Sequence, residues 1–206
     1  VTNIEELEHA FTRRALDRLG QHSNIEVLGN LEADRLSIIS FQIGRGGDGL
    51  HYGLVVAMLN DLFGIQARGG CSCAGRYAHK LLNINDAESR KIESHIKAGS
   101  VYDRPGWVRV NFNYFIDEAT FDYILQAIEL IASNGEKLKQ AYQYDESSGV
   151  FAYQGKTASP SNNVVKCFLD NPSAEKFHNQ ERYPTLERGD NQMLEDALVS
   201  ATGVLS

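Results

Sequence analysis

The chain has 206 residues, of which 42% are hydrophobic, and a formal net charge of −7 at pH 7. This length can bury one sizeable hydrophobic core, so we expect one folded domain with an appended tail. The acidic balance, without clustered Lys and Arg, argues against a nucleic-acid binder, and no apolar run is long enough to span a bilayer.

The N-terminal segment and the cysteines indicate the compartment. The first residues carry neither the basic start nor the apolar stretch of a secretory signal. The three cysteines are odd in number, and two of them stand one residue apart, which does not resemble a disulfide framework. We therefore expect a cytoplasmic protein whose partners are small molecules or other proteins. Val1 at the first position is consistent with processing or with a start inside a longer polypeptide.

The first elements are expected to be a helix and a pair of strands. Asn3 and Glu6 have the spacing of a capping box, and Gly20 follows the last apolar residue of the helix that they begin. The apolar stripe of this helix consists of Ile4, Leu7, Phe11, Leu16 and Leu19. Residues 25–28 and 35–43 then have the composition of strands, and an antiparallel pair is the simplest arrangement.

A second helix leads to a short strand and a loop rich in glycine. Apolar residues recur at helical spacing over 54–62, and Gly64 supplies a C-terminal stop. Residues 65–67 are expected to form a short strand that feeds the segment 68–74, whose sequence is RGGCSCA. That segment is interpreted as a loop joining a strand to the next helix.

Two helices and a strand with one polar face are expected next. The helices cover 77–82 and 86–98, the second capped by its first residue, Asp86, and stopped by Gly99. In the strand at 107–113, valines and a phenylalanine alternate with polar residues and a tryptophan.

The last part of the domain is expected to be helical, and a tail follows. Asp117 caps a helix with a clear apolar stripe, a short helix covers 136–142, and residues 145–156 form one edge strand. The stripe consists of Phe121, Ile124, Leu125, Ile128 and Ile131. Residues 157–206 are interpreted as an acidic, loosely ordered tail, because positions 170–206 hold seven acids and three Lys or Arg, a net charge of −4 out of −7. Its residues 192–201 are typical of a short helix.

Two motifs have alternative interpretations. Residues 44–49 match the GxGxxG pattern of dinucleotide sites, but the expected acidic residue about 20 positions further on is missing, so we interpret them as a turn. Cys71 and Cys73 could bind a metal together with His79 and with His51 or His95, although a CxC pair alone is a weak metal signal. One of the two cysteines could equally be a small buried apolar residue.

Arg68 and Arg109 are the arginines whose positions suggest chemistry. Arg68 stands close to both cysteines of the loop, and a guanidinium stabilises a thiolate, which is the reactive form of cysteine. Arg109 lies on the polar face of its strand, where a guanidinium can bind a carboxylate through two parallel hydrogen bonds. The alternative for Arg109 is an ordinary ion pair with a nearby acid.

Two blocks of sequence resemble the pyridoxal-phosphate enzymes of aminotransferase class V, which include cysteine desulfurases. The blocks are residues 59–74 (LNDLFGIQARGGCSCA) and residues 108–114 (VRVNFNY) running into the Asp117 helix. The resemblance covers residues 1–156 and concerns the small C-terminal domain of these fold-type I enzymes. It implies an α+β fold in which an antiparallel sheet is covered by helices.

The resemblance also implies roles for individual residues. Cys73 falls on the position of the nucleophilic cysteine that becomes a persulfide in desulfurases. Arg109 falls on the arginine that holds the substrate carboxylate, and Arg68 corresponds to an arginine near the substrate. Cys71 stands where characterised desulfurases often have histidine, so a transaminase or lyase of the same class is an alternative.

The implied cofactor, pyridoxal phosphate, would be held mainly outside this chain. In the family, the cofactor-binding lysine and the aspartate at the pyridine nitrogen belong to a large domain that precedes this region. We therefore expect a C-terminal domain that is inactive alone, binds no cofactor alone, and belongs to a homodimeric enzyme acting on an amino acid. The alternative is a free-standing redox-sensing or metal-sensing module derived from such a domain.

Overall fold

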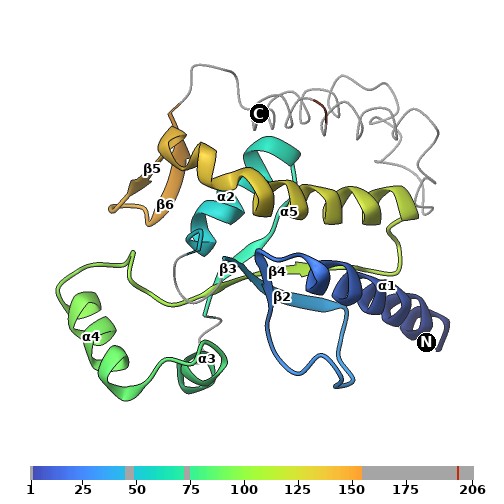
Figure 1. Cartoon of the computed structure of the whole chain (residues 1–206), viewed down its shortest axis with the longest axis horizontal. Coiled ribbons are helices and arrows are strands. Elements are labelled where there is room, and N and C mark those ends of the chain that lie inside the picture. Colours follow the sequence, from blue (N-terminus) through green and yellow to red (C-terminus); the bar gives the residue numbers. More distant parts are fainter. Residues whose placement is uncertain (1, 45–48, 72–74, 155–198, 200–206) are drawn as a thin grey trace, which may run out of the picture.

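The computed structural model of the chain describes residues 2–44, 49–71, 75–154 and 199. Within them the chain is α+β, with an antiparallel sheet and helices on both of its faces (Figure 1). This confirms the expected class of fold. In chain order the elements are α1 (Thr2–Gln21), β1 (Ile25–Val27), β2 (Ile38–Ile43), α2 (Tyr52–Phe63), β3 (Arg68–Gly70), α3 (Gly75–Leu81), α4 (Asp86–Lys97), β4 (Trp107–Asn111), α5 (Glu118–Leu138), the 3-10 helix Lys139–Ala141, β5 (Tyr142–Asp145) and β6 (Val150–Tyr153).

The four strands of the main sheet lie in the order β1-β2-β4-β3, and every neighbouring pair is antiparallel. Alternate residues of β2 and β4 therefore point to opposite faces. The face that meets α2 and α5 carries the apolar set, which is fully buried: Ile39, Phe41, Ile43, Val108 and Val110. We call this the core face, and the opposite one the outer face.

Helices α1, α2 and α5 complete the core. The stripe expected on α5 is confirmed, with Phe121, Leu125, Ile128 and Ile131 buried and Ile124 partly buried. On α1 the expected stripe holds only in part, because Phe11 is buried whereas Ile4 is 39% and Leu7 50% exposed. The first turns of α1 thus extend beyond the core that the described residues form.

Surface ion pairs join α1 to α5. Arg18 binds Glu129 through two hydrogen bonds of 2.7 Å and contacts Asp122 at 3.2 Å. Arg14 binds Glu118 in the same two-pronged way, at 2.8 and 2.9 Å. These contacts join residues more than a hundred positions apart in the sequence and hold α1 beside α5.

The outer face is covered at one end by α3. Ala78 of α3 packs on Leu28 and Trp107, and all three side chains are buried. Figure 1 shows α3 and α4 on the opposite side of the sheet from α2 and α5. Helix α4 has no buried residue, so its side chains are not part of either core cluster.

Several expected boundaries are wrong. Residues 65–67 are not a strand, and the strand is instead β3, the first three residues of the expected loop. The N-cap of α4 is Asn85, whose side chain accepts hydrogen bonds from the N–H groups of Ala87 and Glu88, and Asp86 is the first helical residue. The carboxylate of Glu88 accepts from the Asn85 N–H at 3.0 Å, which completes a capping box.

The end of the domain also differs from the expectation. Helix α5 continues to Leu138 and a 3-10 turn follows, so no separate helix covers 136–142. Residues 142–153 form the hairpin β5–β6 rather than one edge strand, and this hairpin packs against α2. Two aromatic pairs face each other across the turn at 146–149, Tyr142 with Tyr153 and Tyr144 with Phe151, and such cross-strand pairs stabilise a hairpin.

The expected tail at 157–206 lies outside the described residues apart from Val199, which is helical and exposed. Residues 45–48 of the GxGxxG match also lie outside them. Among the helices that the structure describes, none combines the length and apolar character needed to cross a membrane.

Candidate functional site

The sheet register places the two candidate arginines directly opposite each other. Arg68 on β3 pairs with Arg109 on β4, and Arg109 pairs on its other side with Ser40 on β2. Directly paired residues of an antiparallel sheet point to the same face. Because Val108 and Val110 point into the core, the row Arg68, Arg109 and Ser40 lies on the outer face.

The two guanidinium groups of this row are available to a ligand. Arg68 is exposed and Arg109 is half-buried. No hydrogen bond or ion pair joins either guanidinium to another residue that the structure describes. Like charges directly opposite each other on a sheet are destabilising, and an anion between them would remove the repulsion. The row therefore has the charge and the donors to bind a carboxylate or a phosphate.

Backbone sterics explain the glycines of β3 and Gly106, though not all by the same constraint. A Cβ on Gly69 would lie 2.8 Å from Cδ2 of Tyr52, so a side chain there would collide with α2. Gly70 has open space around it but a φ of +113°, which L side chains rarely adopt. A Cβ on Gly106 would also meet Tyr52, at 2.7 Å. Small residues thus let β3 approach α2 and pair with β4.

Of the two loop cysteines, the structure describes only Cys71. Cys71 follows β3, is half-buried, and packs against the cluster around Trp107 on the outer face. Burial, with smaller contributions from Tyr144 and Cys71, raises the pKa of Tyr52. Cys73 lies outside the described residues, so its role as nucleophile stays a prediction.

Trp107 adds an unused hydrogen-bond donor to the same face. It pairs with Gly70 across the β3–β4 ladder, two residues before Arg109. Its side chain is 4% exposed, and its indole N–H finds no acceptor among the described residues. The alternation of the strand predicted the face on which Trp107 lies, but only the structure shows that α3 buries it.

Two of the three histidines considered as metal ligands, His51 and His95, have other side-chain contacts. No three His, Cys, Asp or Glu side chains gather in a metal-binding arrangement in the described part of the chain. His95 Nδ1 lies 3.0 Å from Asp103 Oδ2. His79 is half-buried on α3, and His51 caps α2.

His51 holds three segments together. Its Nδ1 accepts the Gly53 N–H at 3.1 Å, and its Nε2 lies 3.1 Å from the Tyr102 carbonyl oxygen, so the neutral ring with hydrogen on Nε2 satisfies both contacts. Its ring stacks on Tyr102 at 4.6 Å and also contacts Phe151 of β6. Burial lowers the pKa of His51, against smaller raising contributions from the Tyr102 carbonyl and Asp103.

A second network that the sequence analysis missed lies after α4. Asp103 accepts a hydrogen bond from the Ser100 hydroxyl at 2.7 Å and pairs with His95. The Ser100 hydroxyl, followed by His95, holds the pKa of Asp103 below its usual value. The S-x-x-D spacing that ends in Asp103 is a local signal for such a turn, whereas the contact with His95 depends on how the chain folds back on α4.

Gly44 and Gly49, the first and last residues of the GxGxxG match, lie against each other. The Leu50 N–H donates to the Ile43 carbonyl at 2.9 Å, and the backbones of Gly44 and Gly49 pack so closely that neither could carry a Cβ without overlap. Gly44 has a φ of +91°. Backbone sterics therefore require glycine at positions 44 and 49, whereas the expected turn between them stays a prediction.

Neither the protein-family models nor the curated proteins contain a match to this chain.

Proposed function

We propose that this chain is the substrate-binding C-terminal domain of a pyridoxal-phosphate enzyme of aminotransferase class V. The observation that carries the proposal is the direct pairing of Arg68 with Arg109 on an exposed face of the sheet. Two guanidinium groups with no ion-pair partner among the described residues suit the α-carboxylate of an amino-acid substrate. Antiparallel strands flanked by helices are compatible with the small domain of such an enzyme.

In this proposal Arg109 orients the substrate and Arg68 adds a second positive charge. Arg109 is the better anchor, because it is half-buried on a central strand whose neighbours hold its backbone on both sides. Ser40 lies next in the row and offers a hydroxyl to the same anion. Cys73, in the segment that follows β3, is the candidate nucleophile for sulfur transfer.

The described residues fit the substrate carboxylate but not the cofactor itself. In the family that the chain resembles, the lysine that would hold the cofactor belongs to the preceding large domain, and none of the four strands of the main sheet carries a lysine. The cofactor would therefore be held by a large domain of the same polypeptide, in a homodimer, and when bound it supplies an electron sink. Alone, this chain is proposed to be inactive.

The proposal is tested by replacing Arg109 in the full-length enzyme that it implies. Arg109→Ala should raise KM for the amino acid by about 10- to 100-fold, since a bidentate contact to a carboxylate is lost. Arg109→Lys should restore only part of the lost affinity for the amino acid, because an ammonium cannot make two parallel hydrogen bonds. Arg90→Ala on the exposed side of α4 is the matched control and should leave KM unchanged. An unaltered KM in Arg109→Ala would give Arg109 a structural role only.

Cys73→Ala separates the desulfurase from the transaminase and lyase alternatives. In a desulfurase this variant should abolish sulfur release from cysteine while substrate binding persists, because the sulfur has no thiolate to accept it. Cys71→Ala is the control, and it should retain release. Sulfur release that survives in Cys73→Ala would remove Cys73 from the mechanism.

The alternative, a free-standing redox or metal module, is distinguished by two simple measurements. The reading frame upstream should encode a large domain, and a gene that starts at Val1 would end the domain proposal. This chain mixed with pyridoxal phosphate should develop no imine absorbance. A lysine adduct trapped by borohydride at one site would contradict the assignment of the cofactor to another domain.

A further inference from the structure

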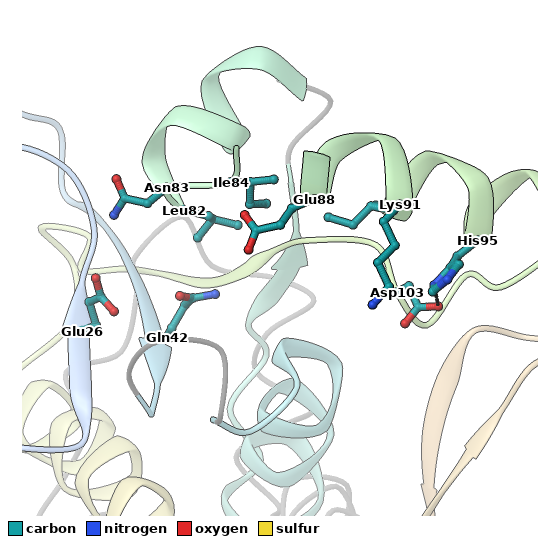
Figure 2. Close-up of a pocket in the computed structure, with 10 residues that line it drawn as sticks. Glu26, Gln42, Leu82, Asn83, Ile84, Glu88, Lys91, His95 and Asp103 are labelled. Atoms are coloured by element: carbon teal, nitrogen blue, oxygen red, sulfur yellow. Dashed lines mark hydrogen bonds and ion pairs between the residues drawn. The ribbon is translucent and has the colours of Figure 1, made fainter. Parts of the chain in front are cut away.

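A groove of about 550 Å³ lies between the outer face of the sheet and the α3–α4 region, apart from the arginine row (Figure 2). Its floor includes Glu26 of β1 and Gln42 of β2, and its wall includes Leu82, Ile84 and Ile92. In Figure 2 the side chains of Glu26 and Gln42 rise from neighbouring strands toward the chain that joins α3 to α4. The volume is in the range of small-molecule sites.

Glu26 and Gln42 present acceptor oxygens to this groove. They are directly paired across the β1–β2 ladder, so their side chains lie on the same face. The Nε2–H group of Gln42 donates to the Gly106 carbonyl at 2.9 Å, which leaves Gln42 Oε1 as the free acceptor. Glu26 is half-buried, and no described cation lies within ion-pair distance of its carboxylate. Among the described residues, neither the Glu26 carboxylate nor Gln42 Oε1 has a hydrogen-bond donor.

The other charged groups of the groove do not neutralise Glu26. Glu88 is engaged by the Asn85 N–H, and Asp103 by Ser100 and His95. The lining holds three carboxylates, Glu26, Glu88 and Asp103, against the single ammonium of Lys91, so its net charge is −2 when His95 is neutral. The charge of the lining residues themselves favours a cation.

We propose that this groove binds an aliphatic primary amine, with the ammonium between Glu26 and Gln42 Oε1 and the apolar stem along Leu82, Ile84 and Ile92. An ammonium offers three donors and a positive charge, which match a carboxylate and an amide oxygen. The three apolar side chains line the same cavity and would remove the stem from water. An anion or a neutral alcohol with the same stem would gain only the burial of that stem.

The test is an NMR titration of the 206-residue chain with n-pentylamine. Backbone amide shifts of Glu26, Gln42 and residues 82–84 should saturate. 1-Pentanol should bind about tenfold more weakly or worse, because it forms no charge-assisted hydrogen bond, and pentanoate should not bind. Shifts that do not saturate, or equal binding of pentanol, would overturn the proposal.

Matched variants separate a specific site from the general acidity of the chain. Glu26→Gln should weaken n-pentylamine by about tenfold, whereas Glu32→Gln, an equal charge change on the exposed β1–β2 connection, should not. Equal losses in the two variants would show diffuse attraction and refute the site. If Glu26→Gln lowers the folded fraction, Ile84→Ala provides a second test, since loss of stem contacts should also weaken binding. Arg109→Ala should bind n-pentylamine normally, which keeps this site separate from the proposed carboxylate site.

Discussion

At the scale of single residues, backbone sterics explain why two glycines, Gly69 and Gly70, follow Arg68. Gly69 is required because α2 occupies the space where its side chain would be, and Gly70 because of its positive φ. These are two different constraints on neighbouring residues. Together they let an exposed edge strand hold Arg68 in register with Arg109.

Gly70→Ala should lower the free energy of unfolding by about 1–3 kcal/mol, because a residue with Cβ is strained at this φ although nothing blocks its side chain. Urea unfolding measures the loss. Gly75→Ala is the matched control, since Gly75 also has open space around it but no positive φ, and it begins α3. A Gly70→Ala variant as stable as the control would mean that β3 adopts another backbone conformation.

At the scale of elements, His51 connects the N-terminus of α2 with the 100–106 segment and the β5–β6 hairpin. One ring nitrogen caps the helix and the other meets the Tyr102 carbonyl. Protonation puts hydrogen on both nitrogens, so a proton on Nδ1 would face the Gly53 N–H and the cap would be lost. The neighbouring Asp103 favours the charged form, but burial has the larger effect and lowers the pKa of His51.

This arrangement predicts acid sensitivity at the N-terminus of α2. The pKa of His51 is lower in the folded chain than its usual value of about 6.5, so as pH falls the unfolded chain binds the proton first. Stability from His51 is therefore complete above about pH 6.5 and decreases below it, down to the pKa of the folded state. Unfolding free energies measured from about pH 7 to about pH 5 should show this slope.

His51→Asn is the variant that isolates the effect. Asn caps helices well but does not titrate, so the variant should lose less stability than the parent between the same two pH values, although it forfeits the ring contacts. His79→Asn on α3 serves as the control and should keep the slope of the parent. Parallel pH profiles for His51→Asn and the parent would refute the role of His51.

At the scale of the whole molecule, the sheet order β1-β2-β4-β3 creates the arginine row from three distant parts of the sequence. Ser40, Arg68 and Arg109 become neighbours only because β4 enters between β2 and β3. Two positive charges placed opposite each other cost stability when no anion is bound. An anion held as in the proposed carboxylate site would remove this cost.

Arg68→Gln should therefore raise the Tm of the chain at low ionic strength, and the gain should shrink as sodium chloride screens the repulsion. Thermal unfolding at low and high salt measures it. Arg76→Gln, an exposed arginine of α3 outside the sheet, should show a smaller change. If Arg68→Gln lowered Tm at low salt, Arg68 would have a stabilising partner and the row would not be open to an anion.

Much of the fold was predictable because its signals are local. The caps and stops at Asp117 and Gly64 and the alternation of β2 and β4 depend on neighbouring residues alone, and the structure confirms them. The strand β3 was missed because glycines have low strand propensity, and only pairing with β4 makes it a strand. Similarly, Asn85 rather than Asp86 caps α4, because the choice between adjacent cap residues depends on the path by which the chain enters the helix.

The candidate site was predictable as residue types and not as geometry. Arginine at 68 and 109 indicated anion binding because a guanidinium keeps its charge and its planar donors in any fold. Their pairing, the burial of Trp107 beneath α3, and the groove at Glu26 and Gln42 depend on strand order and on which helix covers the outer face. Periodicity along the chain specifies which side chains share a face of one element, whereas contacts between elements distant in sequence arise only when the common core is packed.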